Sequence, residues 1–201
     1  MIRVLLADDH LLIREALVLL LGTEDDIEVV ADVGRGDHAV ERALTLKPDV
    51  AVLDIDMPGM DGLAVAQHLS KELPGTRLVI VTGHGRPGNL RQAMAAGVRG
   101  FLGKDTPGAR LAQVIRQVHE GARYIDPQLA ADALAADECP LTPRELETLR
   151  AAADGSPVSR IARGLGLSQG TVRNYLSAAV TKLGVDNRHA AVKAARDLGW
   201  L

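Results

Sequence analysis

The sequence predicts an α/β domain followed by an all-α domain. Residues 1–120 alternate short aliphatic runs with longer amphipathic stretches, which is the pattern of a parallel sheet with crossover helices. From residue 141 onward only helical patterns remain. The charge also divides: residues 1–139 hold 14 basic and 21 acidic residues, net −7, whereas residues 140–201 hold 9 and 5, net +4. We therefore expect domains at 1–120 and 141–201, joined by a linker at 121–140.

The first domain is predicted to be a doubly wound sheet of five parallel strands. Aliphatic and β-branched runs predict the strands at 2–7, 27–33, 50–53, 78–82 and 98–102. Amphipathic stretches predict the helices at 11–21, 37–46, 63–73, 88–96 and 108–120. Pro48, Pro74 and Gly97 stand where helices should stop before a strand. Functional side chains are then expected at the carboxyl ends of the strands.

The second domain is predicted to contain four helices. An alanine-rich piece at 129–136 leads through Cys139 to Thr142, Pro143 and Glu145, which together form an N-cap, N1 proline and capping-box arrangement. Three further helices are predicted at 157–165, 168–183 and 188–198.

Composition excludes several classes of protein. With 47% hydrophobic and 24% charged residues the chain is no disordered polar polymer, and at 2% aromatic content aliphatic side chains must fill its cores. The apolar run at 16–21 is far shorter than the roughly 20 residues that a membrane span needs. A single cysteine, Cys139, excludes an internal disulfide and a cysteine-based zinc site. We expect a cytoplasmic protein with no signal peptide and no insertion into a membrane.

Carboxylates follow two of the predicted strands. Asp8 and Asp9 end the first strand, and Asp54 and Asp56 follow the third. These strand ends are neighbours in a doubly wound sheet, so the carboxylates would repel one another unless a cation lay among them. A hard divalent ion, most simply Mg²⁺, meets that need. Singly, Asp8 or Asp9 could instead cap the next helix and Asp56 could belong to a turn, but their coincidence at two strand ends favours the metal.

A hydroxyl and an ammonium group are delivered to the same edge. Thr82 ends the fourth predicted strand and Lys104 follows the fifth. Alone, these are an ordinary strand-end threonine and a surface lysine. Together with Asp54 and a metal site they supply the nucleophile, the neutralising charge and the donors that a phosphoryl group needs. The set predicts phosphorylation of an aspartate.

These residues resemble a known family. Asp8 and Asp9, Asp54 before the Met-Pro-Gly-Met-Asp-Gly run at 57–62, Thr82, and a phenylalanine three positions before Lys104 are similar in order and spacing to the receiver domain of two-component response regulators, a flavodoxin-like fold. The resemblance covers residues 1–120 and implies a sensor histidine kinase as the partner that donates the phosphoryl group.

The resemblance also implies individual roles. Asp54 would be the phosphoacceptor and, with Asp9, a direct Mg²⁺ ligand. Asp8 would hold the metal through water, and the backbone carbonyl of Asp56 would complete the protein ligands. Lys104 would pair with the phosphate.

Thr82 and Phe101 resemble the pair of residues that switches on phosphorylation. Phe101 stands where tyrosine is commoner, so its ring cannot donate a hydrogen bond, although its burial can still change. We expect Thr82 to turn toward the phosphoryl group, Phe101 to follow, and the shift to promote a homodimer.

The net positive C-terminal domain has the pattern of a helix-turn-helix. Two helical stretches flank a tight turn that contains Gly166, and Ser168 caps the second stretch. Helical hairpins with glycine turns also occur in domains that bind nothing. The segments at 141–145, 161–162, 170–175, 182–185 and 187–188 resemble the LuxR-type helix-turn-helix of NarL/FixJ response regulators from residue 141 to the C-terminus, which implies binding to double-stranded promoter DNA.

By that resemblance residues 168–183 form the recognition helix. Arg173, Asn174 and Ser177 would face base edges in the major groove. Backbone phosphate contacts would come from Thr171, Lys182 and Arg188. The final helix would form the contact between two DNA-bound copies, and RNA polymerase is a further partner to consider.

The sequence thus predicts a transcription regulator with no enzymatic activity beyond slow autodephosphorylation. Two other functions are alternatives to this prediction. Asp54 and Asp56 also begin the motif of haloacid dehalogenase-like phosphohydrolases, but Pro58 departs from it. The receiver could also be a dimerisation module that works without phosphorylation. The intact acidic pocket argues against this alternative.

Three features remain open at the level of sequence. The helix at 11–21 is more apolar than one buried face requires, so it is either deeply packed or exposes a face to a histidine kinase or a second receiver. None of the six histidines shows metal-ligand spacing beside Cys139, so no transition-metal site is assigned; His84 either tunes dephosphorylation or is a solvated loop residue. Residues 86–88 and the Gly199-Trp200 ending resemble regulators of membrane-lipid desaturation.

Overall fold

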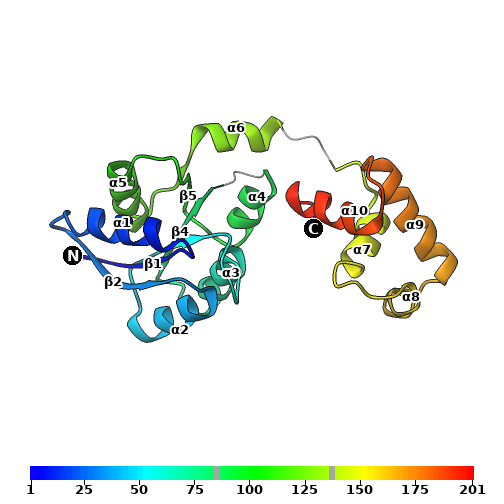
Figure 1. Cartoon of the computed structure of the whole chain (residues 1–201), viewed down its shortest axis with the longest axis horizontal. Helices are drawn as coiled ribbons and strands as arrows, with labels where there is room; N and C mark the ends of the chain where they lie inside the picture. Colours follow the sequence, from blue (N-terminus) through cyan, green and yellow to red (C-terminus); the bar gives the residue numbers. More distant parts are fainter. Residues whose placement is uncertain (84–86, 136–138) are drawn as a thin grey trace. The chain divides into compact units, whose positions relative to one another are not determined.

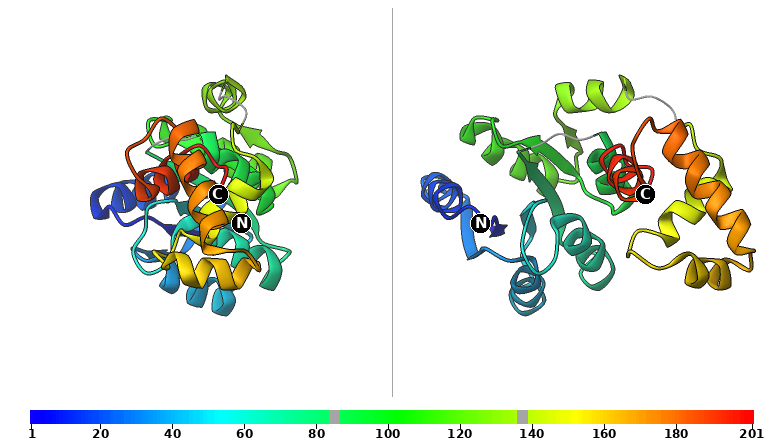
Figure 2. Two further views of the ribbon diagram at one scale, coloured as in Figure 1. Left: turned by 90° about the vertical axis from the view of Figure 1, so that its right-hand side faces the viewer. Right: turned by 45° about the vertical axis from the view of Figure 1, so that its right-hand side comes forward.

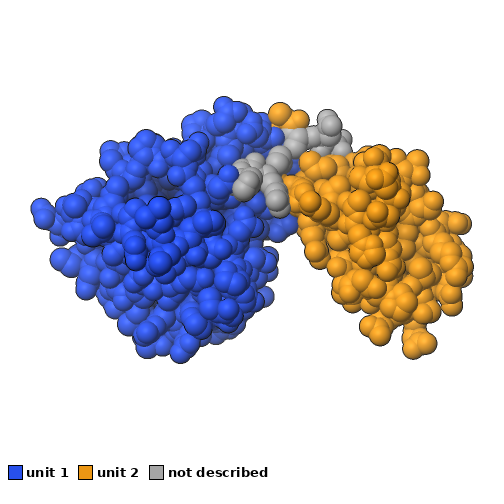
Figure 3. Space-filling model, in the orientation of Figure 1, with its two compact units in different colours: residues 1–85, 89–133 blue, residues 86–88, 134–201 orange. Residues whose placement is uncertain are grey.

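The computed structural model describes residues 1–83, 87–135 and 139–201. It divides into two compact units, coloured separately in Figure 3: residues 1–85 and 89–133, and residues 86–88 and 134–201. Each unit has its own hydrophobic core.

The first unit is built on a parallel sheet with the strand order β2-β1-β3-β4-β5-β6. The strands, labelled in Figure 1 where there is room, are β1 Ile2–Ala7, β2 Ile27–Val33, β3 Val50–Asp54, β4 Arg77–Thr82, β5 Gly100–Gly103 and β6 Tyr124–Ile125. The order reverses at β1, which pairs with both β2 and β3. Parallel α/β sheets place their ligand sites at such a switch point, here between the carboxyl ends of β1 and β3.

The prediction of five strands is wrong, because the sheet has six. β6 has only two residues and pairs with Gly100 and Phe101 of β5, so it is too short to show a periodicity in the sequence. β5 also starts two residues later than predicted. The amide of Val98 donates to the carbonyl of Ala93 at 3.0 Å and completes the end of α4 instead of entering the sheet.

Helices cover both faces of the sheet, as a doubly wound fold requires (Figure 2). α1 (Leu11–Leu21) and α5 (Gly108–His119) pack on one face. The other face carries α2 (Gly36–Leu46), α3 (Gly62–Glu72) and α4 (Pro87–Ala95). α6 (Pro127–Ala135) lies in the segment expected to be a linker. Its Ala133 is buried in the same core as α2, α3 and α4.

α1 is not deeply packed on all sides. Leu11, Leu12 and Leu19 are 58%, 80% and 74% exposed, and Leu21 is the residue of this helix that is fully buried. The apolar excess in this stretch is therefore an exposed face.

Two glycines shape the turn that follows β3. Gly59 has φ +81°, which side chains rarely tolerate. Gly62, the first residue of α3, packs so tightly on β3 that a Cβ there would lie 1.9 Å from the carbonyl oxygen of Asp54. The glycine thus lets the helix start directly beneath Asp54.

From residue 139 to the C-terminus the structure shows the four predicted helices: α7 Pro143–Ala151, α8 Val158–Leu165, α9 Gln169–Lys182 and α10 Arg188–Asp197. The predicted capping box at Thr142 and Glu145 is present, and Ser168 caps α9 by accepting from the amide of Thr171. Gly166, with φ +66°, ends α8 in the left-handed conformation that allows the tight turn.

Among the described residues no helix is long and apolar enough to cross a membrane.

We expect Gly62→Ala to destabilise the first unit by about 1–3 kcal/mol, because the added methyl group must displace the backbone of Asp54. Gly75→Ala is the matched control: no atom lies within 4 Å of a Cβ at that position. It should change stability by less than about 1 kcal/mol. Urea unfolding of the two variants measures the difference, and equal effects would contradict the tight contact.

Candidate functional site

Two buried carboxylates share one lysine at the carboxyl edge of the sheet. Asp8 follows β1, Asp54 ends β3, and each is 2% exposed. Lys104, which follows β5, places its Nζ 2.8 Å from Oδ2 of Asp8 and 2.9 Å from Oδ2 of Asp54. Asp54 Oδ2 has this ion pair but no hydrogen bond of good geometry. One ammonium group therefore faces two carboxylates, which leaves negative charge in excess.

Burial and charge shift the pKa values of this cluster. Burial raises the pKa of Asp54, the Lys104 ammonium offsets part of that effect, and the nearby Asp8 carboxylate adds to it. Burial alone would lower the pKa of Lys104, but its two carboxylate partners outweigh that effect and raise it. Lys104 is thus a firmly held cation, whereas Asp54 would be stabilised as an anion by further positive charge.

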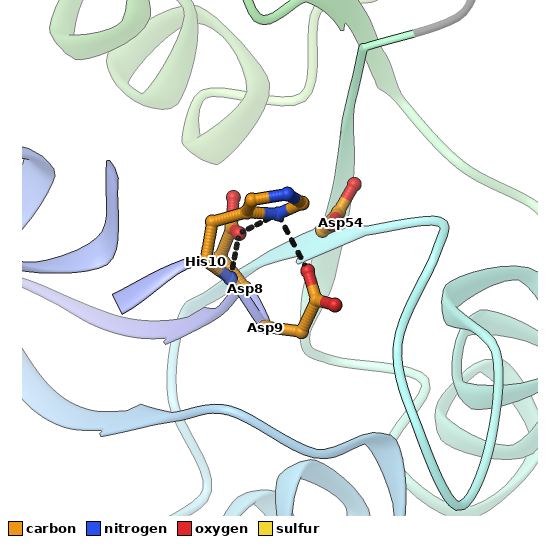
Figure 4. A group of neighbouring side chains, drawn as sticks. All are labelled: Asp8, Asp9, His10 and Asp54. Carbon is orange, nitrogen blue, oxygen red and sulfur yellow. Dashed lines mark hydrogen bonds and ion pairs between the residues drawn. The ribbon is translucent and has the colours of Figure 1, made fainter. Parts of the chain in front are cut away.

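Asp9 and His10 complete a group of potential ligand atoms (Figure 4). One ligand atom from each of Asp8, Asp9, His10 and Asp54 lies within 4.8 Å of all the others. Nδ1 of His10 is 2.7 Å from Oδ1 of Asp9 and 3.5 Å from Oδ1 of Asp8. The sequence pattern predicts the three carboxylates but not the histidine.

Neither Asp8 nor Asp9 caps α1. The N-cap residue is His10, which makes no side-chain cap hydrogen bond. Oδ1 of Asp8 instead accepts from the amide of His10 at 2.8 Å, and Nη1 of Arg14 donates to the carbonyl of Asp8 at 2.6 Å. Arg14 also bonds Asp32 of β2 and so holds the loop in place, a role that the sequence did not suggest.

Of the remaining predicted receiver residues, Asp56 and Thr82 lie at the same edge, and Phe101 lies deeper in the sheet. The side chain of Asp56 is exposed and is not among the clustered ligand atoms. Thr82, at the end of β4, is 2% exposed, and its carbonyl accepts from the amide of Lys104. Phe101 is fully buried in the core formed with α2, α3 and α4.

In the second unit the predicted base-reading residues share one exposed face. Arg173, Asn174 and Ser177 of α9 are all exposed, while Val172 and Leu176 are buried against the core. A shallow depression of about 420 Å³ runs along this face beside Asn174, Ser177 and Lys182.

The predicted phosphate-contacting residues already have partners within the unit. Thr171 Oγ1 lies 2.8 Å from Oγ of Ser168. Arg188 donates to the carbonyls of two residues in the turn before α8. Lys182 Nζ lies 2.8 Å from Oε2 of Glu145, a buried acid that also accepts from the amide of Thr142.

His84 and Arg86, which the sequence singles out, lie outside the described residues.

We expect the Glu145–Lys182 pair to make the stability of the second unit depend on pH. Lys182 lowers the pKa of Glu145 below its ordinary value, and the hydrogen bond from Thr142 adds to this. The stabilisation is therefore present above the unfolded pKa and is lost as pH falls through the folded one. In the full chain Glu145→Gln should lose this component of the pH dependence of the second unit's unfolding, followed by the fluorescence of Trp200. Identical acid profiles for wild type and variant would exclude the pair as a source of stability.

Known protein families match both units of the chain. Residues 4–116 match the family model of the response regulator receiver domain, and residues 139–195 match that of the bacterial regulatory proteins of the luxR family. The chain is 42% identical over 200 residues to the transcriptional regulatory protein DesR of Bacillus subtilis, covering 100% of this chain and 99% of that protein. It is 36% identical to the transcriptional regulatory protein UhpA of Escherichia coli, with 100% of both chains covered.

Among solved structures, the response regulator ChrA of a heme-sensing two-component system is similar at a TM-score of 0.60 and 34% identity, covering 100% of this chain and 98% of that one. This chain therefore belongs to the NarL/FixJ family of two-component response regulators, transcriptional regulators that join a receiver domain to a LuxR-type DNA-binding domain.

Proposed function

We propose that Asp54 is the residue through which this response regulator receives its signal, by accepting a phosphoryl group from a sensor histidine kinase. The observation that carries the proposal is the Lys104 ammonium, which lies within 3 Å of both Asp8 and Asp54 where their strands end. Nothing in a purely structural role calls for two buried carboxylates and a single compensating cation at an open edge of the sheet.

The proposed reaction is a transfer from nitrogen to oxygen. The Asp54 oxygen that Lys104 does not contact attacks phosphorus, and the bond from phosphorus to the histidine of the kinase breaks. The electron pair returns to the imidazole nitrogen. Asp54 becomes an acyl phosphate, and Lys104 remains beside it to pair with the new charge. Hydrolysis of this phosphate without a partner would be slow, and the chain performs no other catalysis.

The residues of the site fit a divalent cation. The carboxylates of Asp8, Asp9 and Asp54 are hard oxygen donors gathered around excess negative charge, and the carbonyl of Asp56 would complete the protein ligands. Asp9 and Asp54 would bind Mg²⁺ directly and Asp8 through water. The ion would neutralise the phosphoryl oxygens during transfer.

Thr82 and Phe101 are proposed to transmit the change. Both are buried in adjacent strands: Thr82 ends β4 beside Gly103, whereas Phe101 lies two residues deeper in β5 and pairs with Ile80. A phosphoryl group adds acceptor oxygens toward which Thr82 turns, and Phe101 shifts with it. The surface altered by the movement of Thr82 and Phe101 then favours a homodimer.

In the second unit α9 is proposed to lie in the major groove of promoter DNA. Arg173, Asn174 and Ser177 read base edges, and Thr171, Lys182 and Arg188 position the helix on phosphates. A dimer places two such helices on paired half-sites, where RNA polymerase is the next partner.

We expect Asp54→Ala to abolish labelling by a small phosphodonor such as acetyl phosphate, because the attacking oxygen is gone. Asp56→Asn is the control: it removes an exposed carboxylate from the same edge but leaves the backbone carbonyl. Intact-protein mass spectrometry should show one phosphoryl group per chain on the control and none on Asp54→Ala.

The phosphorylated or beryllofluoride-treated wild type should also elute as a dimer in size-exclusion chromatography. A treated protein that stays monomeric and binds DNA no better than Asp54→Ala would refute the proposed activation.

We expect Arg173→Ala to relax base preference at one operator position, at a cost of about 1–3 kcal/mol for the preferred site. Arg144→Ala removes the same charge from an exposed position on α7 and should leave the preference intact. Lys182→Ala should weaken binding to all DNA sequences alike. It should also reduce the slope of log affinity against log salt concentration by about one. Selection from random DNA followed by binding titrations measures these quantities; an unchanged preferred sequence for Arg173→Ala would contradict its role.

A further inference from the structure

His10 is the one member of the ligand cluster that is not a carboxylate. Its imidazole comes from the loop between β1 and α1 and lies over Asp9 and Asp8 in Figure 4, on the side that faces Asp54. Nδ1 is 2.7 Å from Oδ1 of Asp9. A nitrogen donor thus lies beside the carboxylate oxygens that are proposed above to bind a cation.

The local structure leaves this ring available. His10 is the N-cap residue of α1, but its side chain accepts no hydrogen bond from the helix. The side chain is 63% exposed, so an ion with its water ligands can reach it. The backbone is nevertheless fixed, because the amide of His10 donates to Asp8 and the carbonyl of Asp8 is held by Arg14.

The distances fit coordination with small adjustments. In an octahedral site with bonds of about 2.1 Å, adjacent ligand atoms lie about 3 Å apart and opposite ones about 4.2 Å apart. The separation of 2.7 Å between His10 Nδ1 and Asp9 Oδ1 suits adjacent positions. All the ligand atoms of the cluster lie within 4.8 Å of one another, and the two exposed members, Asp9 and His10, are free to adjust. Ligation through Nδ1 leaves the ring proton on Nε2.

We propose that His10 is a direct nitrogen ligand of the divalent ion in this site and determines which ion the site prefers. Carboxylate and carbonyl oxygens suit Mg²⁺, whereas imidazole suits the ions of the later first transition row. With His10 the site should favour Co²⁺, Ni²⁺ or Zn²⁺ over Mg²⁺ more strongly than its oxygens alone would. The inference rests on the proposed function, because it assumes that Asp54 and its neighbours bind a cation.

The contact with Asp9 allows a different role, in which His10 only orients that carboxylate by a hydrogen bond. A purely orienting histidine would support every ion equally, since the oxygen ligand it holds is common to all of them. A ligating histidine supports the nitrogen-preferring ions selectively. The ratio of affinities for two ions separates these roles.

The test is a calorimetric titration of the full chain with Ni²⁺ and with Mg²⁺, each alone, in wild type and in His10→Asn. Asparagine can still donate a hydrogen bond to Asp9 but is a poor ligand for Ni²⁺. We expect the ratio of Ni²⁺ to Mg²⁺ affinity to fall at least about tenfold, with the Kd for Mg²⁺ within about twofold of wild type. His68→Asn, which removes an exposed histidine from α3, is the matched control and should leave the ratio unchanged.

A ratio in His10→Asn equal to that of wild type, or a parallel loss for both ions, would overturn the inference. Ring ¹⁵N spectra give an independent measurement: Zn²⁺ should shift Nδ1 of His10, and absence of that shift at saturation would equally overturn it. Asp54→Asn separates this outcome from failure of the proposed site, because it should weaken Ni²⁺ and Mg²⁺ together. If Asp54→Asn leaves both affinities unchanged, the cation site itself is wrong and the assignment of His10 as its ligand is refuted with it.

Discussion

The ion pairs of Lys104 with Asp8 and Asp54 are the contacts on which the first unit's chemistry depends. They join the ends of β5, β1 and β3, and all three side chains are nearly buried. Removing Lys104 would leave two carboxylates without a cation in a desolvated place, which is far costlier than losing a surface salt bridge. The strand order, the tight start of α3 at Gly62 and the anchoring of the β1–α1 loop by Arg14 all serve to bring these groups together. The same excess of carboxylates makes the edge receptive to a cation, which would also offset the charge of the phosphoryl group proposed to bind there.

The second unit uses some of its charge internally. Glu145 both closes the capping box of α7 and pairs with Lys182 at the end of α9, so one buried acid ties the start of α7 to the end of α9. Arg188 similarly donates to carbonyls in the turn before α8. The cations at the ends of α9 and α10 therefore help to orient the exposed face of α9, and Arg173 and Asn174 on that face carry the proposed sequence recognition.

Most of the fold followed from local patterns. Periodicity and breakers place the long strands, and the helices for which both ends were predicted, within two residues of their observed ends; Thr142 and Ser168 mark helix starts through their caps. The sixth strand was not predicted, because two residues are too few to show a periodicity in the sequence and the strand depends on pairing with β5. Asp8, Asp54 and Lys104 were predictable because strand ends in a parallel sheet meet at one edge. His10, Arg14 and Glu145 were not, since their partners are fixed by side-chain direction and by distant segments such as β2 and α9.

We propose that phosphorylation of Asp54 governs where this regulator binds DNA. Genome-wide footprinting in cells that carry either wild type or Asp54→Ala, expressed at equal levels, measures this dependence. We expect occupied sites built from paired half-sites in wild type under the inducing condition and their loss in Asp54→Ala. Equal occupancy of the same sites by both proteins would contradict it.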